Sequence, residues 1–193
     1  KITGGGNLIL GSESFKNAEL KGNTGDGSSI TYELTGGATM ANTNSNRYFR
    51  WTTVGAYVAK GVTLCLSVMY KPVSGADEFC MEIAYTAGYS TSQSWATIKP
   101  TDQLEIEQTD GWVLRYGLWT PPDNATLKLV DMGSGTTHAG TGNYTNKFSL
   151  LHPMLQYGNA PTAWNASSGD YLTQESAKSL FSQTADEIKT EVT

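Results

Sequence analysis

Apolar and polar residues alternate along the chain up to residue 157. A period of two is typical of β-strands, because successive side chains of a strand point to opposite faces of the sheet. Clusters of glycine, asparagine, aspartate or proline, which favour turns, bound most of the alternating runs. The pattern predicts strands at 30–35, 47–53, 62–71, 78–86, 103–108, 112–119, 125–131 and 146–156.

Short strands at this spacing predict an all-β fold, a jelly-roll β-sandwich, within residues 7–165. No amphipathic helical pattern separates the strands, which excludes a βαβ architecture. A chain of this length buries a sizeable core without a second domain. We therefore expect a β-sandwich module at residues 1–165, followed by a linker and a C-terminal helix at residues 166–193.

Alternation also assigns the two faces of three strands. In each strand one set of side chains is apolar and is predicted to face the core, whereas the other set is half polar and is predicted to line a solvated face. The predicted core sets are Leu64, Leu66, Val68 and Tyr70; Phe79, Met81, Ile83 and Tyr85; and Trp112, Leu114, Tyr116 and Leu118. The opposite sets are Thr63, Cys65, Ser67 and Met69; Glu78, Cys80, Glu82 and Ala84; and Val113, Arg115, Gly117 and Trp119.

The pattern changes after Trp164. Residues 174–193 contain neither glycine nor proline, and Thr173 and Glu175 suit the N-cap and the first turn of a helix. Apolar residues then recur at spacings of four, three and four, as in the seam of a coiled coil. We expect this helix to lead into an oligomeric stalk. The seam residues are Phe181, Ala185, Ile188 and Val192.

Composition and charge narrow the function. The net charge is −5 and the 13 basic residues form no cluster, so no nucleic-acid partner is expected. No run of about 18 apolar residues occurs, so no membrane insertion is expected. The 21 glycines, 10 tyrosines and 5 tryptophans, with 16% charged residues, suit polar loops and a surface for neutral polar ligands. The chain has no initial methionine or signal-peptide pattern and ends inside the predicted helix, so we expect it to be part of a longer protein.

Two cysteines, Cys65 and Cys80, lie within predicted strands. One pair of thiols does not form a disulfide framework. The sequence favours two buried free thiols over a cross-strand disulfide.

Several stretches follow one another in a characteristic order along the chain. They are Asn7-Leu-Ile-Leu-Gly11 with Phe15, Val62 to Lys71, Asp110-Gly-Trp112 through Leu118, Thr120-Pro-Pro122, and Ala125 to Leu129. In this order they resemble the carbohydrate-binding modules of the family four, nine and twenty-two group. The resemblance implies a β-sandwich that binds carbohydrate.

The end of the chain resembles versions of this domain in phage tail and prophage minor structural proteins, at Pro153-Met-Leu-Gln-Tyr-Gly158, Trp164 and residues 182–189. This resemblance implies a tail-fibre or receptor-binding protein of the virion that contacts a host cell-surface glycan and trimerises through its C-terminal helix. Ile188 in the seam agrees with a trimer, because β-branched residues at such a position disfavour parallel dimers. The alternative is a purely structural module that spaces or trimerises the fibre.

Modules of this group often hold a structural calcium between the N-terminal loop and an aspartate on the last core strand. Glu13 is present in the N-terminal loop, but the strand Lys147-Phe-Ser-Leu-Leu151 has Ser149 near the expected acid. The resemblance therefore leaves open a calcium with Glu13 as a ligand.

Catalysis is not expected. The chain has two histidines, His138 and His152, and no spacing of histidine, cysteine and acidic residues supplies the three or four ligands of a metal site. Glu105 and Glu107 share one strand face, whereas the two acids of a glycosidase face each other across a cleft. We interpret them as part of a solvated face.

Neutral sugars are bound by aromatic rings, which stack on the sugar, and by carboxylate, amide and guanidinium groups, which bond its hydroxyls. Glu82, Arg115 and Trp119 offer this combination on the predicted solvated face, and Arg50 joins them if its own face is solvated. The alternative is that this face packs against another domain or protomer.

A second candidate set of sugar-binding residues lies in a predicted loop. It consists of Tyr89, Gln93 and Trp95. The alternative for Trp95 is that it folds back and anchors the loop.

Overall fold

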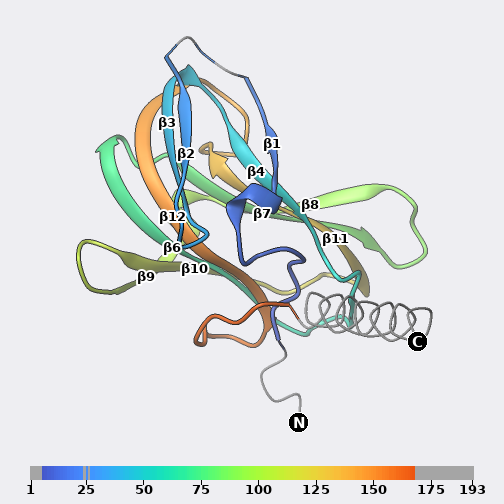
Figure 1. Cartoon of the computed structure of the whole chain (residues 1–193). Helices are drawn as coiled ribbons and strands as arrows, with labels where there is room; N and C mark the ends of the chain where they lie inside the picture. Colours follow the sequence, from blue (N-terminus) through green and yellow to red (C-terminus); the bar gives the residue numbers. More distant parts are fainter. Residues whose placement is uncertain (1–5, 24, 26, 168–193) are drawn as a thin grey trace, which may run out of the picture.

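Two antiparallel β-sheets pack face to face in the computed structural model, which describes residues 6–23, 25 and 27–167 (Figure 1). Sheet I has six strands in the order β1-β4-β11-β7-β8, with β5 paired to β11. Sheet II has six strands in the order β2-β3-β12-β6-β10-β9. The predicted all-β sandwich is confirmed, whereas the jelly-roll path and the module boundary at residue 165 stay predictions.

The eight predicted strands are all present with shifted bounds, and β1, β3, β5 and β8 are additional. Two 3-10 turns, η1 (Phe15–Asn17) and η2 (Pro100–Asp102), lie between strands. Sheet I consists of β1 (Glu19–Lys21), β4 (Tyr48–Thr52), β5 (Tyr57–Val58), β7 (Phe79–Ala87), β8 (Gln93–Ile98) and β11 (Ala125–Ser134). Sheet II consists of β2 (Ser29–Tyr32), β3 (Ala38–Ser45), β6 (Leu64–Gly75), β9 (Leu104–Glu107), β10 (Val113–Trp119) and β12 (Tyr144–Tyr157).

Two aromatic clusters fill the space between the sheets. In the first, the ring of Phe15 meets the rings of Phe49 and Trp51 edge to face, with 4.9 Å between centroids in both pairs. Such aromatic contacts dominate the burial energy of a core. The second cluster joins the two sheets and consists of Tyr70, Phe79 and Phe148.

The predicted core faces of β6 and β7 are confirmed, because their apolar sets are buried between the sheets. The opposite faces are less solvated than predicted. Over sheet II the chain after β12 folds back, where Thr162 donates a hydrogen bond to Gln156 (2.8 Å) and the Trp164 indole donates one to the Pro153 carbonyl (3.2 Å). The residues buried on the opposite faces include Cys65, Ser67, Cys80, Glu82 and Ala84.

Strand β10 turns to the core the face opposite to the predicted one. Its register places Val113 and Trp119 beside core-facing residues of β6, so that Trp112 and the residues that alternate with it lie on the outer face. Gly117 belongs on the inner face, because a Cβ there would lie 2.3 Å from Ile98 Cγ2. The predicted core position of Trp112 is therefore wrong. Both faces of β10 carry large apolar residues, and alternation alone does not separate them.

Asn7 connects the start of the described chain to its end. It is 1% exposed, and its side-chain oxygen accepts hydrogen bonds from the amides of Ile9 and Leu155, both at 3.1 Å. The two hydrogens of its side-chain nitrogen are shared among three oxygens, which belong to Ser12 (2.9 Å), Pro153 (2.9 Å) and Asn165 (3.1 Å). A buried amide with every bond satisfied rigidifies the segments that it joins.

Both cysteines are buried free thiols, as the sequence favoured. Burial raises the pKa of Cys65 and of Cys80 to about 12, so neither is ionised at pH 8. The thiolate is the nucleophile, and we therefore expect a colorimetric thiol reagent at pH 8 to modify neither cysteine in the folded protein and both in guanidinium. Fast modification of the folded protein would show that one of the thiols is accessible.

The predicted helix at 174–193 and its coiled-coil seam lie outside the described residues. Within the described part of the chain, no helix is long and apolar enough to cross a membrane.

Candidate functional site

A row of hydrogen-bonding side chains crosses the outer face of sheet I. Strand register places Glu19, Arg50, Asp131, Glu82 and Thr97 next to one another, on β1, β4, β11, β7 and β8 respectively. Buried apolar neighbours in the central strands face the core, and the period of two directs the row outward. Residues far apart in the sequence are thereby brought to one level of the sheet.

Arg50 and Asp131 form the centre of this row. The guanidinium donates two hydrogen bonds to the carboxylate, at 2.8 and 2.7 Å, and this paired geometry orients both groups. The Asp131 side chain is 2% exposed and that of Arg50 is 23% exposed. Burial raises the pKa of Asp131, and the hydrogen bonds from Arg50 oppose this rise. The same hydrogen bonds raise the pKa of Arg50, so the guanidinium stays charged.

Glu82, next to Asp131, is held by a neighbouring strand and by a loop. Its Oε1 accepts a hydrogen bond from Thr97 Oγ1 at 2.7 Å and lies 2.7 Å from His138 Nδ1. The Glu82 side chain is 4% exposed, whereas that of His138 is 56% exposed. The loop between β11 and β12 that carries His138 therefore closes one side of the row with an accessible imidazole.

Two aromatic side chains flank Arg50. The guanidinium carbon lies 5.5 Å from the ring centre of Tyr48 and 5.4 Å from that of Trp95, within the range of cation–π attraction. These groups, with Glu82, Asp131 and His138, line an open concavity of about 300 Å³. We call this concavity the Arg50 site. It combines half-buried rings with fixed donors and acceptors.

Three of the predicted binding residues, Arg50, Glu82 and Trp95, come together in the Arg50 site. Tyr89 and Gln93 do not, because they are exposed in and next to the β7–β8 turn. Trp95 lies in strand β8 and not in a loop. Sequence reasoning missed Tyr48, Asp131 and His138. Tyr48 stands two residues before Arg50 on the same strand face, and this spacing was a usable signal.

The predicted placement of Arg115 and Trp119 on the solvated face is wrong. Arg115 is 5% exposed, and its guanidinium lies 3.9 Å from the ring centre of Tyr70 and forms ion pairs with Asp77 and Glu105. Glu105 is therefore a partner of Arg115 and not part of an unpaired acidic face.

The ring of Trp119 lies 4.6 Å from that of Tyr85, and Trp119 packs against the core from sheet II. It is thus a structural residue between the sheets, and it is remote from the outer face of sheet I that carries the Arg50 site.

Glu13, the predicted calcium ligand, contacts a neighbouring side chain of the N-terminal loop. It is exposed, and its carboxylate accepts a hydrogen bond from Asn17 at 2.8 Å. Ser149, near the expected aspartate, bonds Thr39 on the outer face of sheet II. The described residues contain no group of three histidine, cysteine or acidic side chains that could hold a metal. A calcium with Glu13 as a ligand would therefore need carbonyl or amide oxygens for its other ligands, and it stays a prediction.

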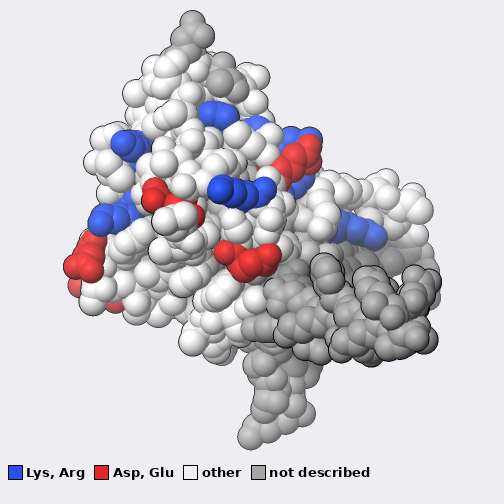
Figure 2. All heavy atoms as spheres, in the orientation of Figure 1, with Lys and Arg blue, Asp and Glu red and all other residues white. Residues whose placement is uncertain are grey.

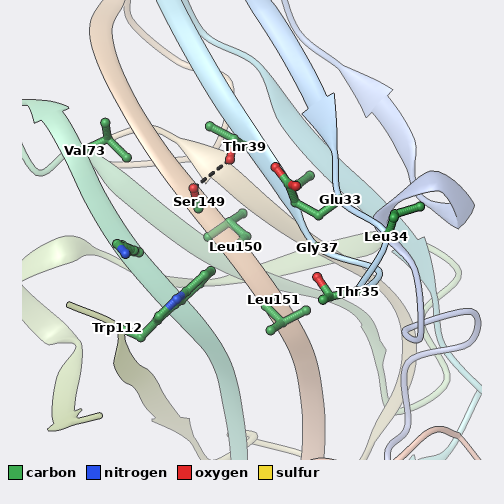
Figure 3. Close-up of a pocket in the computed structure, with 12 residues that line it drawn as sticks. Glu33, Leu34, Thr35, Gly37, Thr39, Val73, Trp112, Ser149, Leu150 and Leu151 are labelled. Atoms are coloured by element: carbon green, nitrogen blue, oxygen red, sulfur yellow. Dashed lines mark hydrogen bonds between the residues drawn. The ribbon is translucent and has the colours of Figure 1, made fainter. Parts of the chain in front are cut away.

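A second and larger concavity, of about 430 Å³, lies on the outer face of sheet II (Figure 3). We call it the Trp112 groove, after the half-buried indole in its wall.

In the view of Figure 2, charged side chains are scattered over a surface that is mostly uncharged. The side of the molecule seen in that view therefore shows no basic patch that would attract a nucleic acid.

No family model and no curated protein matches this sequence. Among solved structures, the chain is similar to the CBM22-1–GH10 modules of xylanase 10B from Clostridium thermocellum in complex with xylohexaose, with a TM-score of 0.48 and 15% identity over 82% of this chain and 30% of that one. It is similar to the enzymatically active domain of tailspike protein 4 of bacteriophage CBA120, with a TM-score of 0.49 and 11% identity over 79% of this chain and 21% of that one.

The chain is also similar to the tripod from the baseplate of bacteriophage Tuc2009, with a TM-score of 0.44 and 12% identity over 86% of this chain and 60% of that one. It thus spans less than two thirds of each of these three proteins. The solved structures to which the chain is similar include carbohydrate-binding modules and phage tail and baseplate proteins, the two groups named by the sequence resemblance.

Proposed function

We propose that this chain is a non-catalytic glycan-binding module of a phage tail or receptor-binding protein, and that the Arg50 site binds a neutral saccharide of the host cell surface. The observation that carries the proposal is the combination of two aromatic rings with a row of fixed hydrogen-bonding groups in one open concavity. Trp95 and Tyr48 supply the rings, and Arg50 and the exposed imidazole of His138 supply the polar groups, each held in place by a buried carboxylate, Asp131 or Glu82.

The chemistry of a sugar fits this combination. Its C–H face packs on an indole or phenol ring, while its hydroxyls accept from a guanidinium and bond an imidazole. The polar side chains are already oriented by their hydrogen bonds to one another, so binding freezes few additional rotamers. A preorganised site of this kind favours affinity without a change of backbone.

The charges of the site favour a neutral ligand. Asp131 and Glu82 stand next to each other, and Arg50 is bonded to Asp131. A carboxylate or phosphate on the ligand would meet the second acid, Glu82, which lowers the affinity for anions.

The partners of the two acids also favour binding over hydrolysis. Asp131 is committed to Arg50, and Glu82 to Thr97 and His138. A glycosidase needs one acid to protonate the leaving group and a second to act on the sugar or on water. Neither role suits a carboxylate that is buried and already bonded.

The phage setting is supported by the sequence resemblance at residues 153–158 and 182–189. It implies a location in the virion and a trimer formed through the C-terminal helix. The seam residues lie outside the described part of the chain, so the trimer is inferred from this resemblance and from the spacing of the seam residues.

A structural role in the fibre is the second candidate, and one observation favours it. Leu104, Ile106 and Leu118 on the outer face of β9 and β10 are 53%, 44% and 43% exposed, and together they form an apolar surface that a neighbouring domain or protomer could cover.

The glycan proposal predicts that Trp95→Ala weakens saccharide binding about 5- to 150-fold, which corresponds to the loss of roughly 1–3 kcal/mol from one stacked aromatic ring. The wild-type chain is first screened on an array of neutral oligosaccharides and bacterial surface glycans. The affinity of each variant for the saccharide bound on the array is then measured by isothermal titration calorimetry.

Tyr89→Ala is the matched control, because Tyr89 is fully exposed in the turn after β7 and makes no contact with the site. It is expected to bind as the wild type does. A wild-type chain that binds no glycan on the array, or a Trp95→Ala variant of unchanged affinity, would remove the support for the Arg50 site.

A further inference from the structure

The outer face of sheet II carries its own line of hydrogen-bonding side chains. Thr39 on β3, Ser149 on β12 and Lys71 on β6 are direct neighbours in the strand register. Residues that alternate with them, such as Met40 and Phe148, lie in the core, so the line faces outward. It lies on the side of the sandwich opposite to the Arg50 site.

A tight turn places an aromatic ring at the end of this line. Asp110 and Gly111, between β9 and β10, both have positive φ angles, 57° and 78°, as in a type I′ turn. The amide of Trp112 closes the turn by bonding the Thr109 carbonyl at 3.1 Å. This geometry fixes the register of β10 and sets the indole of Trp112 on the outer face beside Lys71.

The groove has two walls and a polar floor. In Figure 3, Trp112 and Val73 lie on one side, the turn with Glu33 and Leu34 lies on the other, and the Thr39–Ser149 pair lies between them. Its volume of about 430 Å³ is within the range of small-molecule sites.

The floor and the walls keep unused hydrogen-bonding capacity. The hydroxyls of Thr39 and Ser149 are 2.7 Å apart, and this bond uses one of their two hydrogens, so one hydroxyl hydrogen remains for a ligand. Neither Lys71 nor Glu33 forms an ion pair with another described residue. The groove thus presents a free ammonium near its indole and a free carboxylate on the opposite wall.

We propose that the Trp112 groove is a second saccharide-binding site, independent of the Arg50 site and specific for a neutral oligosaccharide. The apolar face of one sugar ring packs on Trp112, and its hydroxyls bond Thr39 and Ser149. Hydroxyls are the groups that complement both ends of the groove, because they accept from Lys71 and donate to Glu33. An apolar peptide would bury these two charges without a partner, which opposes its binding.

Two sites on opposite faces have a functional consequence. One module can contact two segments of a surface polysaccharide, and the second contact then forms at a high effective concentration. The two sites also differ in chemistry, because the acids of the Arg50 site are buried and bonded, whereas the Trp112 groove presents two hydroxyls, a free ammonium and a free carboxylate.

The test is a titration of the ¹⁵N-labelled chain with xylohexaose, mannohexaose and cellohexaose, each to about 10 mM, so that a millimolar Kd is detected. The indole N–H signals of Trp112 and Trp95, assigned from Trp112→Phe and Trp95→Phe variants, report the two sites separately. At least one hexaose is expected to shift the Trp112 signal. Ser149→Ala is expected to weaken this response about two- to tenfold through the loss of one hydrogen bond and to leave the Trp95 response unchanged.

The outcomes separate the two sites. A Trp112 signal that none of the three hexaoses moves overturns the second site, whatever the Trp95 signal does. A Trp112 shift that disappears in Trp95→Ala also overturns it, because the two rings would then report one site. A Trp112 shift with a silent Trp95 signal supports the groove and counts against the Arg50 site.

Discussion

Replacing Trp51 by alanine is expected to lower the free energy of unfolding by about 3–5 kcal/mol, the range for large aromatic side chains removed from a core. Trp51 is 2% exposed and meets Phe15 edge to face at 4.9 Å. Alanine leaves a cavity where strand β4 and turn η1 meet. Urea denaturation followed by circular dichroism measures the loss.

Two further variants test whether the loss of stability in Trp51→Ala comes from the cavity in the core. The indole nitrogen of Trp51 has no hydrogen-bond partner among the described residues, so Trp51→Phe is expected to cost much less than Trp51→Ala. Trp112→Ala is also expected to cost less, because Trp112 lies on the outer face of sheet II. An equal loss of stability for Trp112→Ala and Trp51→Ala would contradict the face assignment of β10.

Asn7→Ala is expected to lower the free energy of unfolding by about 2–5 kcal/mol, because it leaves buried amides without an acceptor at a cost of roughly 1–3 kcal/mol each. The amides of Ile9 and Leu155 lose the Asn7 oxygen, and the Pro153 carbonyl loses its donor. The measurement is again the urea midpoint, together with amide hydrogen exchange at Leu155. Exchange at Leu155 is expected to become faster in the variant.

Asn17→Ala is the matched control, because Asn17 is an exposed asparagine whose amide bonds Gly11 and Glu13. Its stability is expected to stay within about 0.5 kcal/mol of the wild type, as for most surface substitutions. Asn7→Asp keeps the acceptor but turns a negative charge toward three oxygens, so it is expected to be destabilising as well. An Asn7→Asp variant as stable as the wild type would show that the hydrogen bonds donated by the Asn7 side-chain nitrogen are not needed for stability.

The sequence alone determined the β architecture and the strands in which one face is clearly more apolar than the other. In β6 and β7 the core residues, such as Leu66 and Ile83, alternate with smaller or polar residues. Burial of the apolar set therefore decides which face of each strand turns to the core, and the sequence of the strand itself contains this information. Sequence reasoning also named Arg50, Glu82 and Trp95 for their sugar-binding chemistry, and these three residues line the concavity of the proposed site. It missed β3 (Ala38–Ser45), whose glycine- and asparagine-rich surroundings resemble a turn.

Tertiary structure decided the rest, because the deciding contacts join residues distant in sequence. In β10 both faces carry large apolar residues. The register against β6 and the close contact of Gly117 with Ile98 decide the inner face, which places Trp112 outward and Arg115 inward. The Arg50–Asp131 pair joins residues 81 positions apart in the chain, and no local period reports such a neighbour. Whether a polar side chain reaches solvent or a buried partner is therefore set by strand pairing, which the pattern of a single strand does not contain.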